Sequence, residues 1–133
     1  MIGLDSNVLV RFLTNDDPEQ SAQAKQAMES LTVEEPGYVS LIALVETVWV
    51  LKHHYHISRD SILTTCEGLL NVPTLSFQCA EDIRRSIHTS RQYGIDLPDS
   101  LLSCLNLSAG CRSTLTFDRR ATRLPDMTLI GLS

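Results

Sequence analysis

Four acidic residues occupy positions where their carboxylates could act together in chemistry. Asp5 follows the apolar run MIGL, and Asp118 follows STLTF. Asp99 lies in the segment GIDLPDSLL, and Glu46 interrupts the apolar segment SLIALVETVWVL. Several carboxylates that meet cannot all stay ionised unless a positive charge compensates them, and oxygen-only ligands favour magnesium or manganese over zinc. Such a centre suits phosphodiester hydrolysis, in which metal ions activate a water and stabilise the leaving oxygen.

The predicted secondary structure places these acids at one edge of a sheet. Asp5 and Asp118 directly follow predicted strands, and ligands of an open α/β sheet bind outside the carboxyl ends of its strands. Asp99 falls in the first turn of a predicted helix. Glu46 lies on another helix, and the side chains three and four positions away cannot pair with a carboxylate: Ile42, Ala43, Trp49 and Val50. We therefore expect the four acids to converge at this edge.

Short apolar runs alternate with longer helical patterns along the whole chain. Strands are predicted at MIGL, which we interpret as buried, and at EPGYVS, VPTLSF, CRSTLTF and MTLIGL. One or two helices separate each strand from the next. This order predicts an α/β fold with a central parallel sheet of about four to five short strands and helices on both faces.

Capping residues predict where several of these helices begin and end. Asp17, followed by Pro18, is a favourable helix start, and serines can cap the two helices that follow. Two later helices are each followed by a glycine, which is the preferred residue after a helix C-terminus. The capping serines are Ser40 and Ser58, and the glycines are Gly94 and Gly110.

Each acid also has a purely structural interpretation. Asp5 can cap a short helix over residues 6–13, and Asp118 can cap a turn before RRATRL. Asp96 can cap the next helix with Asp99 at its third position, which capping and the helix dipole would explain completely. The structural interpretation is weakest for Glu46, because a glutamate is almost never fully buried unless it is paired.

Composition and charge narrow the class of protein. A chain of 133 residues suits one domain over residues 1–133, and a net charge of −5 counts against a tight sequence-specific reader of nucleic acid. There is no signal-peptide pattern and no apolar run of about 18 residues, so we expect a cytoplasmic protein without a membrane span. The four cysteines form no C-x-x-C pair, and we interpret them as reduced and mostly buried. Three histidines near residue 55 are interpreted as solvated: His53, His54 and His56.

The acidic residues resemble the pattern of the PIN-domain nucleases, in particular the VapC-like toxins of type II toxin–antitoxin modules. The opening GLDSNVLVRFLTNDDPEQ is similar to the family's strand–Asp–Ser/Thr–Asn start, and LVETVWVL to its glutamate on an apolar helix. IDLPDSLL resembles its D-F-A-D-A-L stretch, with Leu97 and Pro98 in the middle, and LTFDRR resembles the segment of its fourth acid. Each motif is weak alone, but four in order are specific, and together they cover essentially the whole chain.

The resemblance implies an endoribonuclease that depends on Mg²⁺ or Mn²⁺ and acts as the toxin of a toxin–antitoxin pair. Asp5 and Asp99 would be the principal metal ligands, and Glu46 and Asp118 would complete the acidic centre. Two residues beside the strand-end acids are candidates to hydrogen-bond those carboxylates. They are Asn7 and Thr116.

The resemblance also implies partners: an RNA substrate, a second copy in a homodimer, and an antitoxin whose tail wraps the toxin. Segments 7–13 and 22–31 are candidates to line an apolar groove for that tail. A basic rim near Asp118 would hold RNA despite the negative net charge, although solvated surface arginines remain an equal alternative. The rim comprises Arg112, Arg119, Arg120 and Arg123, and a second basic group comprises Arg84, Arg85 and Arg91.

Two other functions are alternatives. The chain could be a phosphatase or phosphotransfer domain with Asp5 as nucleophile, although such phosphatases usually show D-x-D where this chain has DSN. It could also be a catalytically degenerate PIN domain that only binds RNA or protein. The complete set of four acids argues against this second alternative.

Overall fold

The computed structural model describes residues 1–131, which form two compact units. The N-terminal unit is Met1–Ala80, and the C-terminal unit begins at Glu81. No helix in the described part of the chain has the length and apolar character that crossing a membrane requires.

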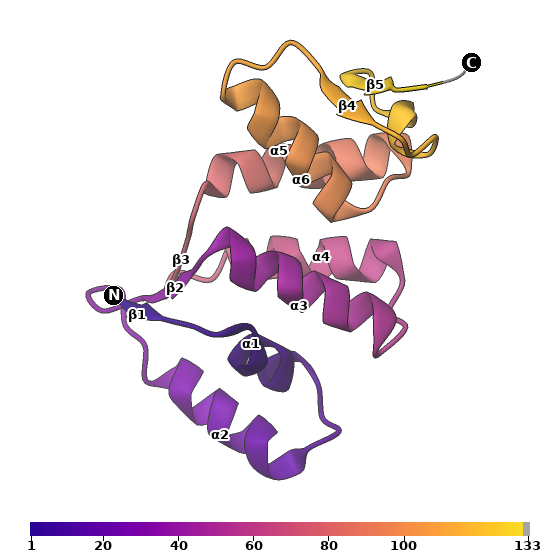
Figure 1. Cartoon of the computed structure of the whole chain (residues 1–133). Coiled ribbons are helices and arrows are strands. Elements are labelled where there is room, and N and C mark those ends of the chain that lie inside the picture. Colours follow the sequence, from indigo (N-terminus) through magenta and orange to yellow (C-terminus); the bar gives the residue numbers. More distant parts are fainter. Residues whose placement is uncertain (132–133) are drawn as a thin grey trace. The chain divides into compact units, whose positions relative to one another are not determined.

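The N-terminal unit is built on a three-stranded parallel sheet in the order β1-β2-β3. The strands are β1 (Ile2–Gly3), β2 (Gly37–Val39) and β3 (Leu75–Phe77). Two helices follow each of the first two strands (Figure 1). They are α1 (Ser6–Leu13), α2 (Pro18–Glu29), α3 (Leu41–His53) and α4 (Arg59–Leu70). Parallel strands require such crossover connections, and helices provide them here.

An apolar cluster joins the helices of the N-terminal unit to its sheet. Met28 of α2 and Leu69 of α4 pack with Leu31 and Leu75. The strand predicted at MIGL is present, but the prediction that it is buried is wrong, because Ile2 is 46% exposed. Among residues 1–131 its only partner strand is β2, so β1 lies at the edge of this sheet.

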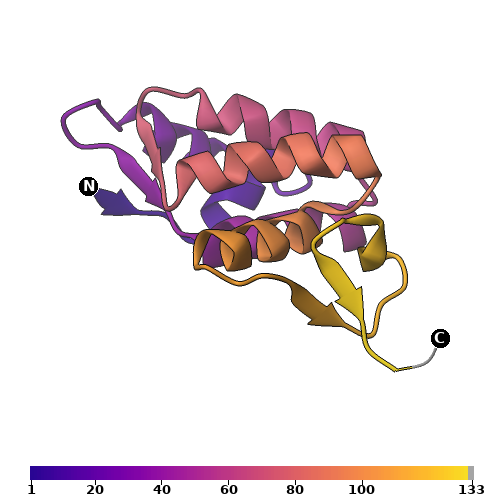
Figure 2. The same ribbon diagram turned by 90° about the horizontal axis from the view of Figure 1, so that it is seen from above.

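The C-terminal unit contains two helices and a two-stranded sheet. α5 (Ala80–Tyr93) starts at the last residue of the N-terminal unit and is followed by α6 (Leu97–Ser108). β4 (Thr114–Thr116) and β5 (Met127–Leu129) run parallel (Figure 2), and the short 3-10 helix η1 (Ala121–Arg123) connects them. The apolar cluster of this unit comprises Ile95, Ala121, Leu124 and Met127, with Tyr93 packed against it.

The α/β class with short parallel strands is confirmed. The described residues contain five strands, which agrees with the predicted number. Their pairing differs from the prediction of one central sheet, because β4 pairs with β5 and the other three strands form their own sheet.

The predicted starts of α2, α3 and α4 and the glycines predicted after α5 and α6 are confirmed. The Asp17 side chain accepts a hydrogen bond from the backbone of α2, and Ser40 and Ser58 do the same for α3 and α4. Gly94 has a φ of 65° and Gly110 a φ of 99°, which is the left-handed backbone that glycine adopts at helix ends.

The cysteines are all free, but the prediction that most of them are buried is wrong. Cys66 on α4 is buried, and this burial raises the pKa of its thiol to about 12. Cys104 is half-buried, whereas Cys79 and Cys111 are exposed. Both exposed cysteines lie in connections just outside helices, where a small apolar side chain has no core to enter.

Candidate active site

A serine hydroxyl brings Asp5 and Glu46 together. Asp5 follows β1 and stands at the N-cap position of α1, but its side chain makes no capping hydrogen bond. The Ser6 hydroxyl, on a residue that is only 6% exposed, donates to Glu46 Oε2 at 2.9 Å and lies 3.4 Å from Asp5 Oδ1. The start of α1 and the middle of α3 therefore present two carboxylates to one hydroxyl group. The interpretation that the Asp5 side chain caps α1 is wrong.

No cation within the N-terminal unit compensates this acid pair. Neither Asp5 nor Glu46 forms an ion pair with any of residues 1–80, and both side chains are exposed. Magnesium keeps several of its waters and is typically bound through one or two carboxylates. The donor set of this pair therefore fits a hard divalent cation.

The surroundings of Glu46 differ from the apolar environment that its sequence neighbours suggest. α3 buries one face, through Ala43, Leu44, Thr47, Val48 and Leu51. Glu46 lies on the opposite, exposed face, where an ionised carboxylate needs no partner. The case for a role of Glu46 thus depends on its hydrogen bond with Ser6 and on the nearby Asp5, and burial makes no contribution to it.

The other two acids lie in the C-terminal unit. Asp99 is half-buried in the first turn of α6, and Asp96 occupies the N-cap position of that helix without a side-chain cap hydrogen bond. Asp118 follows β4, and its Oδ1 accepts a hydrogen bond from the Arg120 N–H at 2.9 Å. The turn predicted as the structural alternative for Asp118 is therefore present, although it uses only one carboxyl oxygen.

The structure thus unites two of the four predicted acids, and the convergence of all four stays a prediction. Among residues 1–131, neither unit by itself places three or more His, Cys, Asp or Glu side chains where they could hold a metal ion. Thr116 accepts a hydrogen bond from the backbone N–H of Asp118 at 3.0 Å, and Asn7 is exposed in α1. Their predicted contacts with the carboxylates also stay predictions.

Ser6 is the site residue that sequence reasoning missed. The only sequence signal for Ser6 is its position directly after Asp5, in DSN, and the same three residues are also typical of an ordinary helix start. Its hydrogen-bond partner Glu46 lies forty residues further along the chain, so no local pattern connects them.

The basic residues fall into two different groups. The four arginines of the predicted rim are exposed, and of these Arg123 donates to the Gly94 carbonyl oxygen at 3.1 Å. In the second group, Arg85 pairs with Asp82, and Arg84 lies 3.8 Å from Glu81. The rim has more charge available for an anionic ligand than the second group has, because helix partners already engage Arg84 and Arg85.

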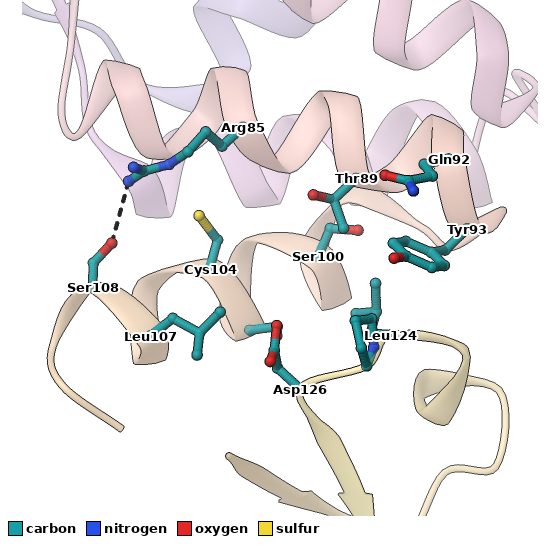
Figure 3. A pocket seen from close by; sticks show the side chains of 12 residues that line it. Arg85, Thr89, Gln92, Tyr93, Ser100, Cys104, Leu107, Ser108, Leu124 and Asp126 are labelled. Carbon is teal, nitrogen blue, oxygen red and sulfur yellow. Dashed lines mark hydrogen bonds between the residues drawn. The ribbon is translucent and has the colours of Figure 1, made fainter. Parts of the chain in front are cut away.

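The C-terminal unit also holds a pocket of about 480 Å³ that none of the four acids lines (Figure 3). Side chains from α5, α6 and the segment before β5 surround it, including Thr89, Tyr93, Cys104 and Asp126. The buried Ser100 hydroxyl lines this pocket and has no hydrogen-bond partner among the described residues. The space is large enough for water to hydrate that hydroxyl.

Comparison with known proteins identifies the family of the chain. The sequence model of the PIN domain matches residues 2–127. The chain belongs to the PIN domain family. A curated relative, the VapC ribonuclease of Aquifex aeolicus (strain VF5), is 29% identical over 123 residues, which is 91% of this chain and 90% of the relative. The PIN match includes segments of both units, and it confirms the resemblance drawn from the four acids.

Proposed function

We propose that this PIN domain chain, as a single domain over residues 1–133, is a metal-dependent endoribonuclease and the toxin of a toxin–antitoxin pair in the cytoplasm. The observation that carries the proposal is the pair of carboxylates, Asp5 and Glu46, held against the Ser6 hydroxyl with no compensating cation among residues 1–80. The family match and the similarity to a VapC ribonuclease support the same function.

In the proposed site, Asp5 and Asp99 would hold Mg²⁺ or Mn²⁺, and Glu46 and Asp118 would complete the acidic centre. A bound divalent cation supplies Lewis-acid activation of water for attack on the RNA phosphodiester and stabilises the leaving oxygen. Ser6 engages Oε2 of Glu46 and lies near Oδ1 of Asp5, so Glu46 Oε1 and Asp5 Oδ2 stay available to the cation.

The neighbouring side chains of the proposed site orient its acids and hold the substrate. Asn7 and Thr116 lie beside the strand-end acids Asp5 and Asp118, where they would hydrogen-bond the carboxylates. RNA phosphates are held by the exposed arginines of the rim, whose charge is local and so tolerates the net charge of −5. These arginines are Arg112, Arg119, Arg120 and Arg123.

The proposal is tested with purified protein, total cellular RNA, and Mg²⁺, Mn²⁺ or EDTA. We expect cleavage with either metal, none with EDTA, and at least about a 100-fold loss of rate for Asp5→Asn. Asp60→Asn is the matched control, because Asp60 is an exposed acid in the first turn of α4 in the same unit. Asp5→Asn protein that cuts as fast as the parent would show that Asp5 is not a metal ligand.

The same assay separates the alternative functions. A degenerate PIN domain would bind RNA in the presence of either metal and leave every RNA intact. A phosphotransfer domain would yield a trapped phosphate ester on Asp5 and no RNA fragments. Sequencing RNA 5′ ends after induced expression identifies the cleaved RNA.

The proposed partners are an antitoxin and a second copy of the chain. A groove of about 280 Å³ lies between α1 and α2 and involves both segments predicted to contact the antitoxin tail. Val8, Ala24 and Ala27 supply its apolar part, and Arg11 and Gln20, which hydrogen-bond each other at 2.9 Å, supply polar groups. We expect the product of an adjacent reading frame to co-purify with the chain, and Ala24→Glu to weaken that complex. The mass of the purified chain by light scattering tests the homodimer.

A further inference from the structure

α3 presents a line of exposed side chains that the core does not explain. Ile42, Glu46, Trp49 and His53 are spaced four, three and four residues apart, so they lie along one face of the helix. Ile42 is 72% exposed and Trp49 is 59% exposed. Tryptophan side chains are usually largely buried. The exposure of Trp49, on the same helix face as Glu46, therefore suggests that its ring contacts a ligand at the surface.

Trp49 is held in place by its neighbour one turn further along the helix. The rings of Trp49 and His53 lie 4.8 Å apart, centroid to centroid, with 38° between their planes. The indole therefore has a supporting ring near it while much of its surface faces solvent. Glu46 lies three residues before Trp49, where side chains of a helix are neighbours about 5–6 Å apart at their Cβ atoms. An aromatic platform thus lies on the same face of α3 as Glu46, within one turn of the helix.

Two kinds of occupant fit an exposed aromatic face: a nucleobase or a second protein surface. The centre of a protein interface is depleted of charged residues, and a charge buried there without a partner is costly. Glu46 stands in the middle of this line, and within its unit no cation pairs with it. The last turn of α3 carries the basic residues Lys52 and His53, which suit the phosphates on either side of a base. These charges favour a nucleotide over a second copy of the chain.

We propose that Trp49 stacks on an unpaired base of the RNA and so positions the adjacent phosphodiester at Asp5 and Glu46. This inference rests on the proposed ribonuclease function and adds a positioning residue to it. Stacking on an aromatic side chain accepts any base, because every base has a π face. The chain is then expected to cut RNA in single-stranded segments and loops, where a base can leave its neighbours.

Fluorescence tests the contact directly, because Trp49 is the only tryptophan of the chain. Asp5→Asn protein is titrated with a short single-stranded RNA, with the same RNA carrying one abasic position, and with a duplex. We expect the single strand to quench the emission of Trp49 and the duplex to quench it less. The abasic RNA should also quench it less when the missing base is the one that would stack on Trp49. RNA that binds without changing the emission would overturn the proposal, whether or not the parent chain proves to be a nuclease.

Variants test the consequence for binding and cleavage. Trp49→Ala is expected to weaken binding of labelled RNA by about 5- to 100-fold and to raise KM more than it lowers kcat. Trp49→Phe keeps a stacking ring and should stay within about 3-fold of the parent. Val33→Ala is the matched control, because Val33 is an apolar residue of the same unit that is 66% exposed. Thermal unfolding of each variant checks that the fold is intact.

The outcomes distinguish this inference from the proposed function. If Trp49→Ala cleaves single strands with the KM of the parent, the stacking role is wrong and the ribonuclease function stands. If Trp49→Ala converts a dimeric parent into a monomer, Trp49 lies between two copies of the chain and the inference is overturned. If Trp49→Ala loses affinity for RNA, Trp49→Phe and Val33→Ala do not, and Trp49→Ala has the same oligomeric state as the parent, the inference holds.

Discussion

Two carboxylates in different units each accept a hydrogen bond from a serine far away in the sequence. In the N-terminal unit, the Ser6 hydroxyl of α1 donates to Glu46 of α3 at 2.9 Å. In the C-terminal unit, the Ser108 hydroxyl of α6 donates to Asp82 of α5 at 2.7 Å. The two hydrogen bonds are alike, but what lies beside each carboxylate differs.

Asp82 is compensated within its own unit, and Glu46 is not. The hydrogen bond from Ser108, followed by that from Arg85, holds the pKa of the Asp82 carboxyl below its usual value. Beside Glu46 the corresponding neighbour is a second carboxylate, Asp5, against the same hydroxyl. A serine–carboxylate contact that includes an arginine ties two helices together, whereas one that includes another acid leaves a negative site that is open to a cation from solution.

Removing each charge separates the two roles most strongly. Glu46→Gln keeps the size of the side chain and an acceptor for Ser6, so we expect a stable protein that has lost at least about 100-fold in RNA cleavage. Asp82→Asn is expected to keep its cleavage rate and to lose about 1 kcal/mol in the free energy of unfolding. Initial rates and urea unfolding of both variants measure this. Equal cleavage by Glu46→Gln and the parent would reduce Glu46 to a structural residue like Asp82.

Removing each hydroxyl should give a smaller effect of the same kind. Ser6→Ala leaves both acids in place but loses the group that orients Glu46, so we expect a cleavage rate about 10- to 100-fold lower. Ser108→Ala is expected to leave that rate unchanged, because its partner Asp82 does not take part in the proposed chemistry.

A second serine controls for the stability cost of Ser6→Ala. Ser21 is also buried in the N-terminal unit, and its hydroxyl donates to the Thr14 carbonyl oxygen at 2.9 Å. Ser21→Ala should cost about 0.5–1.5 kcal/mol of stability without changing cleavage. Should Ser21→Ala and Ser6→Ala slow cleavage equally, the Ser6 effect would be one of stability alone.

Sequence reasoning succeeded where the relevant interaction is local. Ser40 caps α3 through the N–H of Ala43, three residues away, and Asp17 caps α2 through Gln20 in the same way. Such a contact is contained in a few consecutive residues, so their types predict it. The family pattern also selected Asp5 and Glu46 by their order along the chain, and the structure brings both carboxylates to the Ser6 hydroxyl, while their role in catalysis stays a prediction.

The errors concern features that depend on residues far away in the sequence. The apolar run MIGL predicts a strand, but the burial of Ile2 depends on which strands flank it, and β1 has only β2. The exposure of Glu46 depends on which face of α3 meets the core, and the sequence does not reveal this because both faces of α3 carry apolar side chains. The hydrogen bond from Ser6 spans forty residues, so only the fold reveals it.

Acid pH gives the smallest and most specific contrast, and it acts on the C-terminal unit. Because the pKa of Asp82 is lowered from 3.8, its ionised form stabilises the folded chain above that pH, and this contribution is lost as pH falls through the lowered value. The advantage of the parent over Asp82→Asn, about 1 kcal/mol at pH 6, should therefore shrink as the pH is lowered from 6 to below 3.8 and the carboxyl takes up a proton. Urea unfolding across this range measures the difference. A difference that stays constant with pH would mean that Asp82 stabilises the unit through its shape and not through its charge, and the contrast with the uncompensated Glu46 would then lose its electrostatic basis.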